Sequence, residues 1–214
     1  MTFKDLSFKK KLEHIWEYYK WVILGTLFVI FAGGSIVYAT MIKEKPVNYA
    51  GVAVYRSHIT QEQSESLTSA LNSALGLTAP DTVTLSNYYF EESDPIFNVE
   101  MEQKFVTYLF SKELQVVLGV QSDIEMLIDA EYIAPLNEYY TDEELAQLDE
   151  KGLVMYRTDP LDEKEKAFAI DIDGSSLCKS NKIFEGYDEK TYAVIVPIEG
   201  FKDNSRAVIG ELLK

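Results

Sequence analysis

Hydrophobic residues follow one another without a charge from Trp21 to Ile42, a stretch of 22 residues. About 20 apolar residues are enough for a helix to cross the hydrocarbon core of a bilayer. Trp21 and Tyr38 near its ends, with Lys20 and Lys43 outside it, are typical of the two membrane–water interfaces. The pattern predicts a single transmembrane helix at residues 21–42.

The segment before this run is short and basic. Residues 1–20 contain five lysines against three acidic residues, and this excess predicts that the N-terminus lies in the cytoplasm. Leu12, Ile15 and Trp16 share one face of an amphipathic helix, and Trp16 suits the membrane interface. Two interpretations of this tail stay open: an orientation signal that continues into the spanning helix, or a docking site for a partner.

A cleaved signal peptide is the main alternative to a retained anchor, because Val37-Tyr38-Ala39 resembles a small-residue cleavage site. The uncharged run is longer than the apolar region of a signal peptide, which has roughly 7–15 residues. We therefore expect a retained anchor. The expected organisation is a cytoplasmic amphipathic tail (1–20), a transmembrane helix (21–42), a stalk (43–48) and an extracytoplasmic α/β domain (49–214).

Strand-like and helix-like patterns alternate beyond the stalk. Segments rich in β-branched and small apolar residues predict strands at residues 49–55, 82–90 and 114–119. The third is apolar at nearly every position, as in a strand that is covered on both faces. Helical spacing of apolar residues predicts helices at residues 60–75, 98–113 and 123–131. Thr141 and Glu144 form a capping-box pattern that predicts the start of another helix.

The last part of the chain adds strands in close succession. The expected strands are residues 153–157, 166–172 and 191–198, and a final helix begins at about residue 204. The overall alternation predicts an α/β fold with a mixed, mostly parallel sheet and flanking helices. The close spacing of the final strands indicates that one of them runs antiparallel.

Charge and cysteine content narrow the function classes. The chain has a net charge of −15, and residues 43–214 hold 15 basic against 32 acidic residues. No nucleic-acid partner is expected, because phosphate binding needs clustered Lys and Arg. Cys178 is the only cysteine, so no disulfide can form within the chain, and we expect it to be a small buried residue.

Asp171-Ile172-Asp173-Gly174 resembles the first motif of haloacid-dehalogenase-type phosphatases, in which one Asp attacks phosphorus and the next handles the proton. That chemistry requires a later lysine and an acidic pair that follows another parallel strand, whereas the pair Asp188-Glu189 comes before its strand and so lies at the wrong end. We expect a turn in which Asp accepts backbone hydrogen bonds and Gly174 has a positive φ. No enzyme activity, metal or cofactor is expected.

An open α/β sheet places a ligand pocket beyond the carboxyl ends of its strands. The residues expected there are Arg56, Ser57, His58, Tyr88, Gln121, Ser122, Asp123 and Ser175. The pairs Tyr88-Tyr89 and Tyr139-Tyr140 have rings suited to stacking on a sugar or a peptide. Alternation along a strand places one member of each pair in the core.

The stretch Leu114–Leu148 carries a family resemblance. L-Q-V-V-L-G leads into a short helix, an Ala-Pro-Leu return and a Tyr-Tyr pair; AFAIDIDGSSL and TYAVIVPI follow later. This layout resembles the first lobe of extracytoplasmic solute-binding proteins of the type 2 periplasmic class. The opening KKKLEHIWEYYKW is similar to that of uncharacterised single-span membrane proteins of Gram-positive bacteria. The domain is too short for two lobes, so the second is expected to be reduced to residues 153–166 or absent.

These features predict a membrane-anchored, extracytoplasmic recognition module without catalytic activity, in a single-pass arrangement in the cell membrane. The expected partners are the lipid bilayer and a peptide, a wall component or another membrane protein. One alternative is an accessory or scaffold subunit that binds only protein. A remote alternative is a phosphatase-like hydrolase that uses Asp171 and Asp173.

Overall fold

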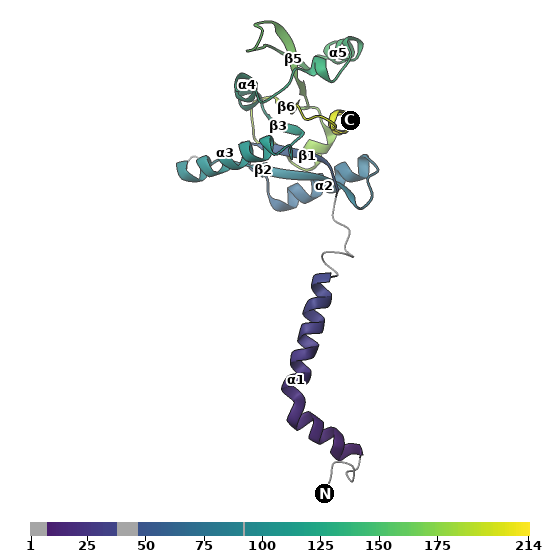
Figure 1. Cartoon of the computed structure of the whole chain (residues 1–214). Helices are drawn as coiled ribbons and strands as arrows, with labels where there is room; N and C mark the ends of the chain where they lie inside the picture. Colours follow the sequence, from purple (N-terminus) through teal and green to yellow (C-terminus); the bar gives the residue numbers. More distant parts are fainter. Residues whose placement is uncertain (1–7, 38–46, 92) are drawn as a thin grey trace. The chain divides into compact units, whose positions relative to one another are not determined.

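The computed structural model describes residues 8–37, 47–91 and 93–214 of this chain (Figure 1). It divides into two units, Met1–Lys45 and Pro46–Lys214, which are described separately below. The first unit contains the 30-residue helix α1 (Phe8–Val37). The second unit is the α/β domain.

Helix α1 carries large apolar side chains that nothing in its own unit covers. Trp21, Phe28 and Phe31 are 76%, 73% and 77% exposed. Trp16 and Lys20, two residues expected at the membrane interface, are also exposed on this helix, whereas Tyr38 and Lys43 lie outside the described residues. Within the described ranges, none of the helices has the length and hydropathy needed to cross a bilayer.

The domain is built on one six-stranded sheet of the order β2-β1-β3-β6-β5-β4. Its strands are β1 (Val47–Tyr55), β2 (Asp81–Tyr88), β3 (Val116–Val120), β4 (Val154–Thr158), β5 (Glu165–Asp171) and β6 (Thr191–Ile195). The pairs β1–β2 and β1–β3 are parallel. The pairs β3–β6, β5–β6 and β4–β5 are antiparallel.

The α/β class and the mixed sheet are therefore confirmed, but the expectation of a mostly parallel sheet is wrong. Three of the five pairings between described strands are antiparallel. The reason lies in the second half of the chain, where β4 and β5 form a hairpin and β6 returns between β3 and β5. Residues 153–166 belong to this hairpin and its turn, and all strands of the described chain lie in one sheet.

Helices cover both faces of the sheet. They are α2 (Gln61–Ala74), α3 (Pro95–Phe110), α4 (Gln121–Asp129), a 3₁₀ turn η3 (Leu136–Glu138), α5 (Asp142–Asp149), α6 (Ser176–Ser180) and α7 (Lys202–Leu212). Successive residues of a strand point to opposite faces. In β1, Val52 and Val54 thus enter the core beneath α2, α5, α6 and α7, whereas Ala53 and Tyr55 enter the core beneath α3 and α4.

The chain reverses its direction of winding at β1. Helix α2 connects β1 to β2 over one face of the sheet. Helix α3 then connects β2 back to β3, which lies on the far side of β1, and it crosses the other face. Neighbouring strands β1 and β3 are consequently followed by helices on opposite faces, α2 and α4. Such a topological switch point leaves the loops after the two strands diverging, and it is where open α/β sheets bind ligands.

Two predictions about buried residues are confirmed. Strand β3 is buried at all five positions, as its apolar sequence indicated. Cys178 is buried in α6, and burial raises the pKa of its thiol. Gly76 also ends α2 as expected, with a φ of +65°.

Candidate functional site

The loops at the switch point bring together two of the residues predicted from the sequence. Arg56 follows β1 with a left-handed φ of 55°, and its Nη1 lies 3.3 Å from Oδ1 of Asp123 in the first turn of α4. The guanidinium also lies 4.5 Å from the ring centre of Phe90. Burial raises the pKa of the Asp123 carboxyl, and the neighbouring Arg56 partly offsets this effect.

The N-terminus of α4 is capped by a carboxylate of the same domain, that of Glu189. Val120, the N-cap residue, contributes no side-chain hydrogen bond. The backbone N–H and hydroxyl of Ser122 instead donate to the two carboxylate oxygens of Glu189, at 2.8 and 3.1 Å. The Gln121 N–H donates to the carbonyl of Lys190 at 2.9 Å. The segment before β6 is thus attached to the helix N-terminus, a position that favours negative charge.

The other predicted residues of this edge are not gathered around one hollow. His58 is exposed and meets the ring of Tyr89 edge-on at 4.9 Å. Ser57 is fully buried, and its hydroxyl has no hydrogen-bond partner among the described residues. Tyr88 is 1% exposed, and burial raises its pKa to about 12. Ser175 is buried and accepts the N–H of Cys178 as the cap of α6.

The two aspartates of the phosphatase-like motif form a turn. Asp171 accepts the N–H of Asp173 at 2.9 Å and binds Nζ of Lys190 at 2.7 Å. The predicted capping by Asp is therefore confirmed, but the predicted positive φ at Gly174 is wrong. The Ser175 N–H donates to the Ile172 carbonyl at 2.8 Å and so closes a β-turn. Such a turn forms with both central residues in the right-handed region, and it needs no glycine with a positive φ. No group of three His, Cys, Asp or Glu arranged to hold a metal occurs in the described ranges.

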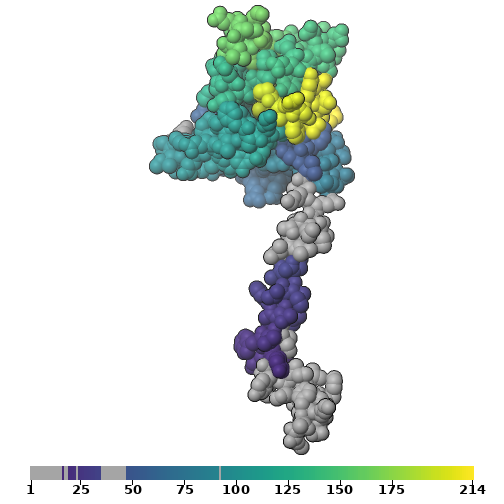
Figure 2. Space-filling model, in the orientation of Figure 1, coloured from purple at the N-terminus to yellow at the C-terminus, as the bar shows by residue number. Residues whose placement is uncertain are grey.

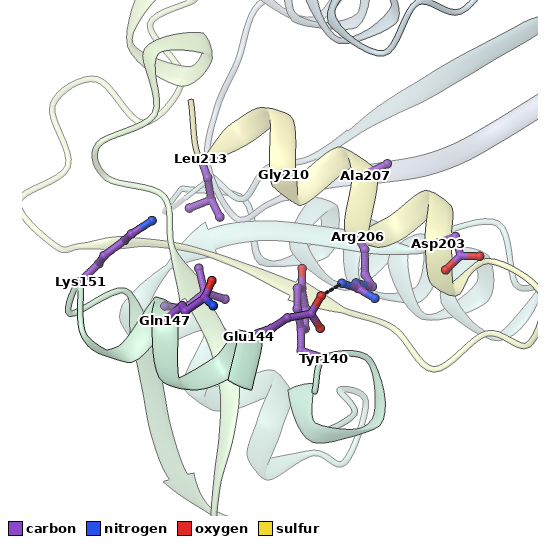
Figure 3. A pocket seen from close by; sticks show the side chains of 10 residues that line it. Tyr140, Glu144, Gln147, Lys151, Asp203, Arg206, Ala207, Gly210 and Leu213 are labelled. Carbon is purple, nitrogen blue, oxygen red and sulfur yellow. Dashed lines mark hydrogen bonds and ion pairs between the residues drawn. The ribbon is translucent and has the colours of Figure 1, made fainter. Parts of the chain in front are cut away.

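A groove that the sequence did not predict lies between α5 and α7 (Figure 3). It encloses about 440 Å³, and its lining includes Tyr140, Glu144, Gln147, Arg206, Gly210 and Leu213. Helix α7, yellow in Figure 2, lies at the surface of the domain. The groove depends on α5 and α7 packing side by side, although about 50 residues separate them in the sequence.

Cations of α7 lie over both members of the Tyr139-Tyr140 pair. Arg206 lies 4.8 Å from the ring centre of Tyr140 and forms an ion pair with Glu144. Lys202 lies 5.9 Å from the ring of Tyr139 and donates to the carbonyl of Glu138 at 2.7 Å. Tyr139 is 8% exposed and Tyr140 is only partly buried, so one member belongs to the core as predicted. The expected reason is wrong, because the pair follows the 3₁₀ turn η3 and does not lie on a strand.

The charge states of the groove follow from these contacts. The backbone N–H of Thr141 is the main cause that holds the pKa of Glu144 below its usual range, and Arg206 adds to it. Burial raises the pKa of Tyr140 to about 12, so this ring is neutral at physiological pH. The groove thus combines a paired Glu144–Arg206 rim with uncharged surface at Gly210 and Leu213.

Comparison with known proteins returned no match, either to a family model, to a curated protein or to a solved structure.

Proposed function

We propose that this chain is a membrane-anchored recognition module without catalytic activity, with its acidic domain on the outer side of the membrane. The observation that carries the proposal is the exposed surface of α1 from Leu24 to Phe31, which is uncharged and almost entirely apolar. Its one hydroxyl, on Thr26, donates to the carbonyl of Val22 at 2.9 Å. Such a surface suits a lipid environment, because its polar groups are satisfied within the helix.

The distribution of charge supports the same arrangement. The lysines of residues 1–20 favour retention of the N-terminus in the cytoplasm. The excess of acidic residues after position 43 keeps a domain soluble and repels anionic headgroups.

The groove between α5 and α7 supports a role in recognition. Arg206 and Glu144 neutralise one another in an ion pair. The lining combines apolar side chains such as Leu148 and Leu213 with the polar groups of Gln147, Lys151 and Asp203. We propose a peptide, a wall component or another membrane protein as the partner.

A second candidate, an accessory subunit that binds only protein, is favoured by helix α3. Ile96, Val99 and Phe110 are 74%, 56% and 67% exposed on this one helix. Ile96 and Val99 lie one turn apart at the start of α3, and Phe110 lies at its end. Exposed apolar side chains that adjoin one another are typical of protein–protein contacts.

Cysteine labelling of intact cells tests the anchor. In a Cys178→Ser background, Lys151→Cys places a thiol at an exposed position just after α5, and Ser7→Cys places one in the N-terminal tail. A membrane-impermeant maleimide should label Lys151→Cys in intact cells but label Ser7→Cys only after lysis. Recovery of the chain in the soluble fraction, or labelling of Lys151→Cys only after lysis, would contradict the proposal.

Site-specific photo-crosslinking separates the two candidates. A photoreactive residue at Gln147 reports on the groove, and one at Val99 reports on α3. If the chain has the recognition role, the photoreactive residue at position 147 should form crosslinked adducts with the partner. If it is an accessory subunit, crosslinked adducts with protein should form from position 99 alone.

A further inference from the structure

Strand β2 forms one edge of the sheet and has an open outer side. Its inner side faces β1, as shown by the N–H of Arg56 donating to the Tyr88 carbonyl at 2.7 Å. On the opposite side, the Val83 N–H donates to Oδ1 of Asn72 at 2.8 Å. Alternate residues of a strand direct their backbone groups to opposite sides. The backbone groups of Leu85 and Asn87 therefore face outward, and no further described strand lies beside them.

This edge lacks the features that commonly protect an edge strand. Natural proteins block such strands with proline, with charged side chains, or by keeping them very short. Pro80 precedes β2 and Asp81 is its first residue, and the rest of the strand, residues 82–88 (Thr-Val-Thr-Leu-Ser-Asn-Tyr), contains neither proline nor a charge. Asn72 covers the Val83 N–H, and the outward N–H of Asp81 donates to the Thr78 carbonyl at 3.1 Å. The remaining outward N–H and C=O groups are available to pair with another extended chain.

A hollow of about 470 Å³ runs beside this edge, between α2 and β2. Small polar side chains of α2, including Ser64, Thr68 and Ser69, form one wall, and Val83 to Leu85 form the other. The hollow is shallow and open to solvent along the strand, a shape that suits an extended chain. A strand added to β2 would place alternate side chains in this hollow.

The charge around the outer edge of β2 indicates which kind of partner would bind there. Residues 57–103 contain no lysine or arginine and include eight acidic residues, and Lys104, just beyond them, lies only at the far end of the strand, 6.0 Å from the ring centre of Tyr88. Glu65 lies in the hollow, exposed, with its carboxylate in a hydrogen bond from Gln61 at 2.7 Å. Two copies of this surface would repel one another, so the charge disfavours pairing of β2 with a second copy of the chain.

We propose that the outer edge of β2 binds an extended, positively charged peptide segment, which adds a further strand to the sheet and places a Lys or Arg beside Glu65. Backbone hydrogen bonds to Leu85 and Asn87 hold the segment, and the hollow beside α2 accepts its alternate side chains. This inference goes beyond the recognition role proposed above, because it adds a second contact surface, separate from the α5–α7 groove, and names the chemistry of its partner. It does not depend on the anchor, so its failure would leave the labelling result unchanged.

The test uses the full chain in micelles of an uncharged detergent and a panel of fluorescent six-residue peptides. The panel combines alternating Thr-Val or Ser-Leu sequences with one Lys, and each peptide has a matched version with Glu in place of Lys. Fluorescence anisotropy should show saturable binding of Lys peptides and at least tenfold weaker binding of their Glu versions. Absence of saturable binding for the whole panel at millimolar concentration would overturn the proposal.

Hydrogen exchange locates the contact. The outward amides of Leu85 and Asn87 should gain protection when peptide is added, whereas the inward amides of Thr84 and Ser86 should be unchanged. Methylation of alternate peptide nitrogens should abolish binding in one register and leave it intact in the other. Protection in the α5–α7 groove instead of at β2 would place the contact elsewhere and overturn the assignment.

Matched variants separate a specific site from general attraction. Glu65→Lys should weaken binding of Lys peptides at least tenfold, whereas Glu143→Lys, an equal charge change at an exposed position of α5, should have little effect. Ser69→Trp should also abolish binding by filling the hollow, whereas Ala146→Trp, at an exposed position of α5 outside the α5–α7 groove, should not. Equal losses from Glu65→Lys and Glu143→Lys would contradict the proposal, as would light scattering that shows peptide-independent dimers blocked by Ser69→Trp.

Discussion

At Gly51, strand β1 passes so close to the carbonyl of Glu113 that an added Cβ would lie 1.7 Å from that oxygen. Gln115 fixes this approach, because its side chain is fully buried, accepts the Gly51 N–H and donates to the Lys112 carbonyl at 2.7 Å. The Gln115 side chain thus contacts main-chain atoms of both Gly51 and Lys112. Main-chain atoms cannot move aside as a flexible side chain can.

Gly51→Ala should therefore lower the free energy of unfolding by roughly 3 kcal/mol or more, since overpacking that forces a backbone shift is at the costly end of such changes. Gly210→Ala is the matched control. Its Cβ would meet nothing within 4 Å, and it lies in α7, where Ala is favoured over Gly by roughly 0.5–1 kcal/mol. Urea unfolding of both variants measures the difference, and a Gly51→Ala variant as stable as the parent would refute this account.

Individual residues also show which parts of the candidate site can be predicted from the sequence. Arg56 and Asp123 were both predicted because each follows the carboxyl end of a predicted strand, where an open α/β sheet binds its ligand. Their direct contact arises because β1 and β3 are parallel neighbours. Gly210 and Arg206 gave no such signal, because their site depends on packing between α5 and α7. The left-handed φ of Arg56 was likewise unpredictable, since arginine has no intrinsic preference for that region.

Among the elements, helix α5 shows how local chemistry determines structure. Thr141 accepts the N–H of Glu144, and the Glu144 carboxylate accepts the Thr141 N–H at 2.9 Å, which completes the predicted capping box. The helix has only eight residues, so its cap satisfies a large share of its free backbone groups.

Thr141→Ala should destabilise the domain by about 1 kcal/mol, the usual effect of losing a helix cap. It should also speed hydrogen exchange in the first turn of α5 and weaken the Glu144–Arg206 pair at the groove. Gln147→Ala, at an exposed position of the same helix, is the control. Unchanged exchange in Thr141→Ala would show that packing alone holds α5.

Most strands and helices were predicted from the sequence, because each carries its own hydrophobic period or cap. Helix α6 was missed, since five residues are too few for a helical period to be recognised. The prediction of strand direction was wrong for a different reason. The connection from β5 to β6 has enough residues for a parallel crossover, and only the ladder with β3 and β5 shows that β6 runs antiparallel.

At the scale of the whole molecule, β6 joins the two halves of the sheet. The strands β2, β1 and β3 lie on one side of it, and β5 and β4 lie on the other. A chain that ends at Lys190 lacks β6 and α7, and should lose cooperative unfolding and become sensitive to protease throughout residues 47–190. Removal of Lys214 alone is the control and should change neither property. A protease-resistant fragment of β1 to β3 from the shortened chain would contradict this prediction.

The position of β6 also determines when the domain can form during synthesis. While the ribosome is still adding residues before Thr191, the emerging polypeptide has two inner edges, on β3 and β5, that have nothing to pair with. The nascent domain must therefore remain open until nearly all of it has been translated. A translocation channel that requires an unfolded substrate would meet this chain in a suitable state, and the sheet would close only after its last strand had passed.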